Sequence, residues 1–110
     1  MFTDNLAAPA KEANPTLSPD ALLRLTELLK SVAHPLRISI VQLLADGEPM
    51  MVTEIYRSLR IEQAEASRQL GILKRSRILK AKRNGKHIHY QLAEPQVLEM
   101  LKCMERCSFV

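Results

Sequence analysis

The sequence contains few aromatic residues and few cysteines. It has no tryptophan, two tyrosines and two phenylalanines among 110 residues, and aliphatic residues and methionine supply most of its 46% hydrophobic content. Such a mixture favours helices and leaves little material for a large sheet. The two cysteines both lie near the C-terminus, which excludes the disulfide framework of a small secreted protein.

Long apolar runs are missing as well. No run approaches the roughly 20 residues that a membrane-spanning helix needs, and no signal-peptide pattern opens the chain. We therefore expect a cytoplasmic protein with no membrane partner. The length suits one domain. Residues 1–17 contain two prolines and no sustained apolar period, so we interpret them as a flexible N-terminal arm that precedes a domain at residues 18–110.

Acidic residues are absent from the segment between Lys74 and His89, which contains seven lysines and arginines. The whole chain has a formal net charge of +4, so this segment concentrates more positive charge than the full excess. A solvated surface and a surface that binds a polyanion both fit such a run, and charge alone does not separate them.

Apolar residues recur at helical spacing along the chain. Ser18 and Pro19 are typical of a helix start, and a leucine-rich stripe continues from there to about Ala33. The same reasoning predicts four further helices: one from Pro35 to Asp46-Gly47, one capped by Thr53 and ending near Leu59, one from about Gln63 to Ser76, and one beginning at Pro95. Residues 48–52 are predicted to form an extended link.

A hairpin is predicted after the fourth helix, because Asn84-Gly85 is a strong signal for a two-residue turn. Pairing outward from this turn sets Arg83 against Lys86 and Leu79 against Tyr90. Alternate pairs then share a face. One face is apolar, with Leu79, Ala81, Ile88 and Tyr90, and the other is basic, with Lys80, Lys82, His87 and His89.

The third and fourth predicted helices form a helix-turn-helix candidate. The fourth helix has a buried stripe of Ala66, Leu70 and Leu73, so its opposite side is free to enter a DNA major groove. The residues predicted to meet DNA from this recognition helix are Gln63, Ala64, Glu65, Ser67, Arg68, Gln69, Gly71, Lys74 and Arg75.

Five residues of that helix have an expected role. Arg68 is the best candidate for direct base readout, and Gly71 would let DNA lie close to the backbone. Ser67 and Gln69 suit either bases or phosphates. Glu65 either accepts from a cytosine amino group or repels phosphate.

The hairpin follows the recognition helix as a wing. Its predicted contact residues are Lys82, Arg83, Asn84, Gly85, Lys86 and His87. Phosphate contacts of this kind position a protein without specifying sequence, and they make binding depend strongly on salt. The predicted partner is therefore double-stranded DNA. His87 and His89 share a strand face, so a metal site and a plain wing surface both remain open.

The chain from about Leu28 to Leu92 resembles the ArsR/SmtB family of winged-helix repressors. The residues that carry the resemblance are LLKSVAHPLRISIVQLLADGE, VTEI and QAEASRQLGILKRSRILKAKRNGKHIHYQL. The resemblance implies a mainly α fold with a small β-hairpin, in the order α-α-α-α-β-β-α. It also implies a homodimer through the first and last helices, an inverted-repeat operator, and release by an inducer that is often a metal ion.

The sequence departs from the family's metal-binding patterns. Many heavy-metal sensors of the family carry Cys-x-Cys in the third helix, where this chain has Met51-Val52-Thr53. Most of the acid and histidine ligands of the zinc-type site on the last helix are also missing. We therefore predict no cofactor and leave the inducer unidentified. Cys103 and Cys107 either bind a soft metal ion or respond to oxidants, or they pack as small apolar residues at a dimer contact.

Two function classes compete with a DNA-binding regulator. One is a winged-helix module that binds proteins and not DNA. A salt titration of binding to duplex DNA separates the two classes, because only the DNA-binding regulator has a salt-dependent affinity for the duplex. The other is an enzyme, for which the chain shows no nucleophile, histidine and acid in a usable pattern and no phosphate-binding loop. We predict that the protein is not an enzyme.

Overall fold

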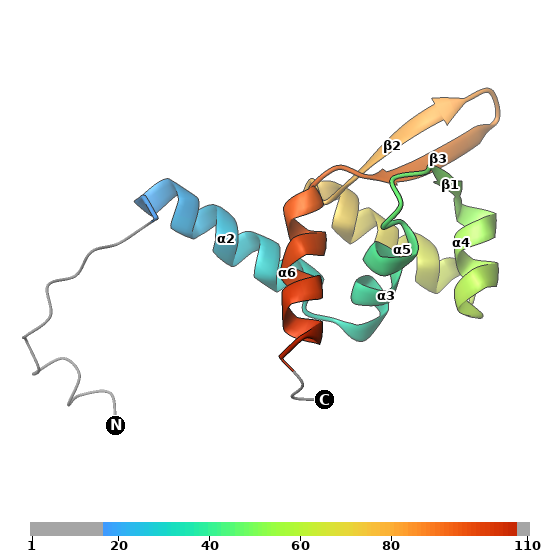
Figure 1. The fold of residues 1–110 in the computed structure, drawn as a ribbon. Helices are drawn as coiled ribbons and strands as arrows, with labels where there is room; N and C mark the ends of the chain where they lie inside the picture. The colour runs from blue at the N-terminus through green and yellow to red at the C-terminus, as the bar shows by residue number, and fades with distance from the viewer. Residues whose placement is uncertain (1–16, 108–110) are drawn as a thin grey trace, which may run out of the picture.

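The computed structural model describes residues 17–107. The arm predicted for residues 1–17 lies outside this range except for Leu17. With labels as in Figure 1, the helices are α2 (Pro19–Val32), α3 (Pro35–Leu43), α4 (Val52–Leu59), α5 (Gln63–Arg75) and α6 (Pro95–Glu105), and the strands are β1 (Met50–Met51), β2 (Leu79–Asn84) and β3 (His87–Leu92). The predicted winged helix-turn-helix fold is confirmed, with β1 as an addition.

Side chains at the helix starts explain where the first helices begin. The Ser18 hydroxyl accepts a hydrogen bond from the Ala21 N–H at 3.1 Å, and His34 Nδ1 accepts from the Leu36 N–H at 3.0 Å. In both helices a proline occupies the following position, where its fixed φ suits a first turn. His34 is thus a helix-start residue.

The start of α4 differs from the prediction. Thr53 does not cap this helix, because α4 already begins at Val52 and Met51 is its N-cap residue. The Glu54 carboxylate accepts a hydrogen bond from the Met51 N–H at 2.8 Å. This contact satisfies a backbone donor at the helix start, so the hydroxyl of Thr53 is not needed there.

One hydrophobic core joins all the helices. It contains Leu28 and Val32 of α2, Ile40, Val41 and Leu44 from α3 and its end, Ile55 of α4, Leu70 and Leu73 of α5, Ile78 and Leu79 at the start of the wing, and Val97 and Leu101 of α6. Burying one such side chain contributes about 1.5–3 kcal/mol to stability. Helix α5, the predicted recognition helix, is therefore fixed to a rigid body on one side.

The strand pairing differs from the predicted register by two residues. Asn84 pairs with His87 and Arg83 with Ile88, so the turn consists of Gly85 and Lys86. Gly85 has φ +68, which suits the first central position of a type II′ turn, and Asn84 stays in the strand. Because side chains alternate with a period of two, a slip of two residues leaves each side chain on its predicted face.

A third strand, which the sequence did not predict, completes the sheet. Met50 pairs with Tyr90 and Met51 with His89, which gives the strand order β1-β3-β2. The hairpin is thereby attached along β3 to the chain segment that leads into α4. Figure 1 shows the far end of the hairpin extending beyond the helices, and α2 extending in another direction.

Candidate nucleic-acid interface

Helix α5 has one buried face and one exposed face, as predicted. Ala66, Leu70 and Leu73 are fully buried. The exposed residues include Gln63, Ala64, Ser67, Arg68, Lys74 and Arg75. A polar and cationic surface therefore covers the outer side of this helix along most of its length.

The turn between α4 and α5 fixes the two helices relative to each other. Ile55 of α4 is fully buried, and the Ile61 N–H donates to the Tyr56 carbonyl oxygen at 3.1 Å. Arg60 adopts a left-handed conformation with φ 57 and ψ 47, which ends α4 and redirects the chain. The arrangement is that of a helix-turn-helix with α5 as its second helix, the predicted recognition helix.

Gln69 is not part of the exposed face, in contrast to the prediction. Its side chain is 5% exposed. The amide Nε2 donates to Glu65 at 2.7 Å, and the amide oxygen accepts from Arg37 of α3 at 2.9 Å. The spacing contained the signal for this position, because Ala66, Gln69, Leu70 and Leu73 together follow the i, i+3, i+4, i+7 pattern of a buried stripe.

Glu65 is engaged by neighbours on its own helix. One carboxylate oxygen accepts from Arg68 and the other from Gln69. Hydrogen bonds from Gln69 and from Arg68 hold the pKa of Glu65 below its ordinary value. The group is therefore a carboxylate at neutral pH, and its predicted contact with a cytosine amino group would have to compete with these two donors.

Gly71 lies on the outer half of α5 without an internal reason to be glycine. A Cβ atom there would meet the Arg75 Nη1 atom at 3.5 Å, which is ordinary van der Waals contact. Glycine inside a helix costs about 1 kcal/mol relative to alanine. The position is consistent with close approach of another molecule to the helix backbone.

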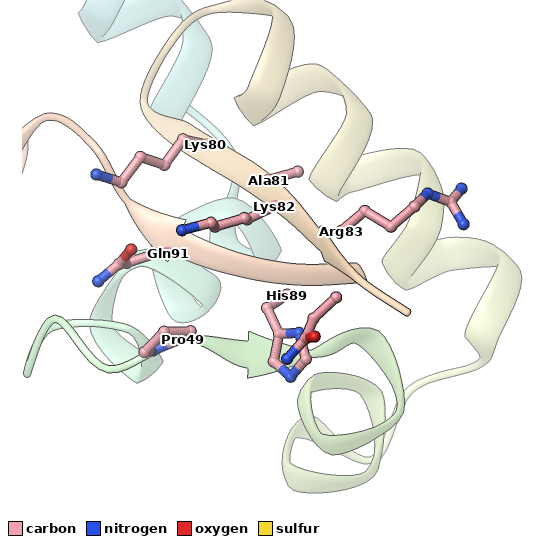
Figure 2. A pocket seen from close by; sticks show the side chains of 8 residues that line it. Pro49, Lys80, Ala81, Lys82, Arg83, His89 and Gln91 are labelled. Carbon is pink, nitrogen blue, oxygen red and sulfur yellow. The ribbon is translucent and has the colours of Figure 1, made fainter. Parts of the chain in front are cut away.

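The predicted wing residues are all exposed. They are Lys82, Arg83, Asn84, Gly85, Lys86 and His87. Figure 2 shows Lys80 and Lys82 projecting together from β2, while Arg83 extends away from them. The two-residue period of the strand explains this division of the cations between the two faces of the wing.

The outer face of the sheet forms a cationic groove of about 710 Å³. Lys80, Lys82, His89, Gln91 and Pro49 line it together with other β2 residues, and none of the lining residues is acidic. Gln91 Nε2 donates to the Gly47 carbonyl oxygen at 2.6 Å. Sequence reasoning placed Lys80 and His89 on this face. It missed Pro49 because strand β1 was not predicted, and Gln91 because the predicted strand pairing ended at Tyr90.

The two thiols lie at the end of α6. Cys103 is in the helix, whereas Cys107 lies in the turn beyond its last residue, Glu105, and both are exposed. The Cys107 thiol donates to the Cys103 carbonyl oxygen at 3.4 Å. Within residues 17–107, no three or more His, Cys, Asp or Glu side chains are grouped so that they could hold a metal ion.

Within residues 17–107, no helix combines the length and apolarity that crossing a bilayer requires.

The α4–α5 pair and the basic hairpin define a winged helix-turn-helix domain. A family model described as a helix-turn-helix domain matches residues 32–80. The transcriptional repressor PagR of Bacillus anthracis is 36% identical over 78 residues, which are 71% of this chain and 78% of that protein. Its crystal structure has a TM-score of 0.72 at 32% identity and covers 79% of this chain and 99% of the other.

Other relatives agree with this assignment. The biofilm growth-associated repressor of Xylella fastidiosa is 36% identical over 77 residues, 70% of this chain and 67% of that protein. The crystal structure of the repressor BigR from Xylella fastidiosa has a TM-score of 0.73 at 30% identity, covering 83% of this chain and 92% of the other. A solution structure from Mycobacterium bovis shows a homodimeric winged helix-turn-helix domain, described as a possible ArsR-family regulator. It has a TM-score of 0.69 at 26% identity and covers 86% of this chain and 90% of the other.

The chain therefore belongs to the ArsR/SmtB family of winged helix-turn-helix transcriptional regulators. Several matched relatives are longer proteins, and the aligned segment spans only 65–66% of their length.

Proposed function

We propose that the protein is a transcriptional repressor that binds an inverted-repeat operator as a homodimer in the cytoplasm. The observation that carries the proposal is the pairing of an exposed, polar α5 face with a cationic wing on one rigid body. The repressors named among its relatives support it. Catalysis has no part in this function.

Each half of the dimer presents one α5 to a major groove. Arg68 and Ser67 contact base edges, while Lys82, Arg83 and Lys86 contact phosphates of the flanking backbone. Two recognition helices related by a twofold axis read half-sites about one helical turn apart.

Exposed leucines on α2 support the dimer. Leu22, Leu23 and Leu29 are 53%, 66% and 46% exposed, and Met104 of α6 is 47% exposed. Four large apolar side chains are thus exposed on the two outer helices, and such exposure favours burial against a partner. The family resemblance assigns dimerisation to the same two helices.

Titration of labelled duplex DNA tests the DNA-binding part. A duplex is first selected from a random pool with the wild-type protein, and affinities for selected and random duplexes are then measured at several salt concentrations. Arg68→Ala should weaken binding to the selected duplex more than to random DNA, whereas Lys86→Ala should weaken both alike. Equal losses from Arg68→Ala would refute base readout by Arg68. Binding without salt dependence would favour the protein-interaction alternative.

Analytical ultracentrifugation tests the dimer. A Leu22→Glu, Leu29→Glu variant should sediment as a monomer, because buried carboxylates facing their twofold copies are strongly disfavoured. Ser58→Glu, on the exposed surface of α4, is the matched control and should leave the dimer intact. A Leu22→Glu, Leu29→Glu dimer would rule out α2 as the interface.

A repressor of this family must also be released from its operator, and we propose thiol chemistry as one way in which this protein leaves DNA. The exposure of both Cys103 and Cys107 favours it. Arsenite, cadmium ions and hydrogen peroxide should then each be tested for release of the selected duplex. Under this candidate at least one of them releases the wild type but not the Cys103→Ser, Cys107→Ser variant. Release that survives the double substitution would exclude the thiols as sensors.

A further inference from the structure

A row of side-chain contacts runs from α3 to the outer face of α5. Arg37 Nη1 donates to the Gln69 amide oxygen at 2.9 Å, and Gln69 Nε2 donates to Glu65 Oε2 at 2.7 Å. Glu65 Oε1 in turn accepts from Arg68 Nη2. We call these four residues the Arg37–Arg68 row.

Gln69 fixes the direction of the whole row. A guanidinium only donates and a carboxylate only accepts, so the amide between them has one satisfactory orientation. Gln69 is 5% exposed, which leaves little access for water to compete for its two contacts. A buried residue, Gln69, therefore holds the Glu65 carboxylate in place, although the Glu65 side chain is itself 30% exposed.

Arg68 is the outermost member of the row. Its side chain is 66% exposed, and Glu65 engages it through Nη2. A guanidinium carries five donors in a planar fork. The carboxylate thus limits the orientations of Arg68 while leaving donors for a second, planar acceptor such as the O6 and N7 edge of guanine.

A carboxylate on a surface that meets DNA has a clear cost, because it repels phosphates. It also lowers the local positive charge that drives nonspecific binding. Both effects weaken contacts that carry no sequence information more than they weaken a bidentate contact with a base. Specificity is a difference between affinities, so an element that weakens the wrong complexes increases it.

We propose that Glu65 is a specificity-determining residue, which orients Arg68 toward a base edge and weakens the attraction of Arg68 for phosphates. This inference rests on the proposed DNA-binding function and assigns Glu65 a role that neither a cytosine contact nor a purely helix-stabilising ion pair would produce.

The test compares discrimination, defined as the dissociation constant for random duplex divided by that for the selected duplex. It is measured at one salt concentration for the full-length wild type, Glu65→Gln, Arg68→Ala and the double variant. Glu62→Gln is the matched control, because Glu62 caps the same helix without a side-chain hydrogen bond. Glu62→Gln removes one negative charge, as Glu65→Gln does, but it leaves the contact between Glu65 and Arg68 in place. Thermal unfolding of each variant verifies that it is folded.

Glu65→Gln should bind random duplex more tightly and lose at least about fivefold in discrimination, the lower range for one bidentate base contact. Glu62→Gln should change both affinities together and keep the ratio. In the Arg68→Ala background, Glu65→Gln should no longer alter the ratio, because no guanidinium remains to be oriented.

Two results would overturn the inference alone: unchanged discrimination in Glu65→Gln, or an equal loss with and without Arg68, which would indicate a direct contact between Glu65 and a base. A wild-type protein that selects no duplex would instead overturn the proposed function, and the inference with it.

Discussion

The hydroxyl oxygens of Ser31 in α2 and Ser76 at the end of α5 lie 2.6 Å apart. The Ser76 hydroxyl also donates to the Ile72 carbonyl oxygen at 3.0 Å, and the Ser76 carbonyl oxygen accepts from Arg24 Nη1 at 3.2 Å. Arg24 approaches Glu94, just before α6, at 3.6 Å. One polar joint therefore connects both outer helices to the recognition helix, so in the proposed dimer α2 sets the spacing of the two α5 helices.

Ser76→Ala should lower the free energy of unfolding by about 1–2 kcal/mol, because it removes two partly buried hydrogen bonds of the hydroxyl. Urea unfolding followed by circular dichroism measures the change. Ser58→Ala is the control, since Ser58 is exposed on α4 and should have almost no effect. Equal effects of the two substitutions would mean that the Ser31–Ser76 contact contributes nothing.

Arg60→Gly should raise the free energy of unfolding by about 0.5–1 kcal/mol. Arg60 has φ 57, a left-handed conformation that costs an L-residue about 1–2 kcal/mol, and glycine avoids most of that cost while losing some chain entropy. The same chemical unfolding experiment applies. Arg57→Gly, inside α4, should instead destabilise the protein by about 1 kcal/mol. A lower free energy of unfolding for Arg60→Gly than for the wild type would contradict the interpretation that Arg60 is strained in this conformation.

The helices were predictable because their signals are local. Ser18, Pro19 and Pro35 mark helix starts by their own chemistry, and in the structure α2 begins at Pro19 and α3 at Pro35. Strand β1 was not predictable in this way. Met50 and Met51 have no strand pattern of their own, and only their pairing with Tyr90 and His89 makes them a strand. Such pairing depends on tertiary contacts that no local pattern contains.

The recognition helix was predictable in its faces but not in its contacts. The period of Ala66, Leu70 and Leu73 separated the buried side from the exposed side correctly. Gln69 is predicted to meet DNA, but its position belongs to the buried stripe and its side chain is buried. Its burial depends on Arg37, 32 residues earlier in the chain, which provides the hydrogen bond that a buried amide requires.

Gly85→Ala should destabilise the protein by about 1 kcal/mol or more, and Asn84→Ala should change stability much less. Gly85 has φ +68, whereas Asn84 lies in β2 opposite His87. Only the glycine position therefore strains an L-residue. Urea unfolding of both variants distinguishes this turn from one centred on Asn84 and Gly85, in which both substitutions would be costly.

Gly71→Ala should stabilise the free protein and weaken its binding to DNA. The added methyl group meets only the Arg75 guanidinium, at 3.5 Å, and alanine is favoured over glycine in a helix by about 1 kcal/mol. On the outer side of α5, however, the methyl group occupies space that a closely approaching DNA backbone or base would need. Urea unfolding and titration of the selected duplex on the same sample measure the two effects. A variant that gains stability and binds DNA as tightly as the wild type would show that DNA does not approach α5 closely at this residue.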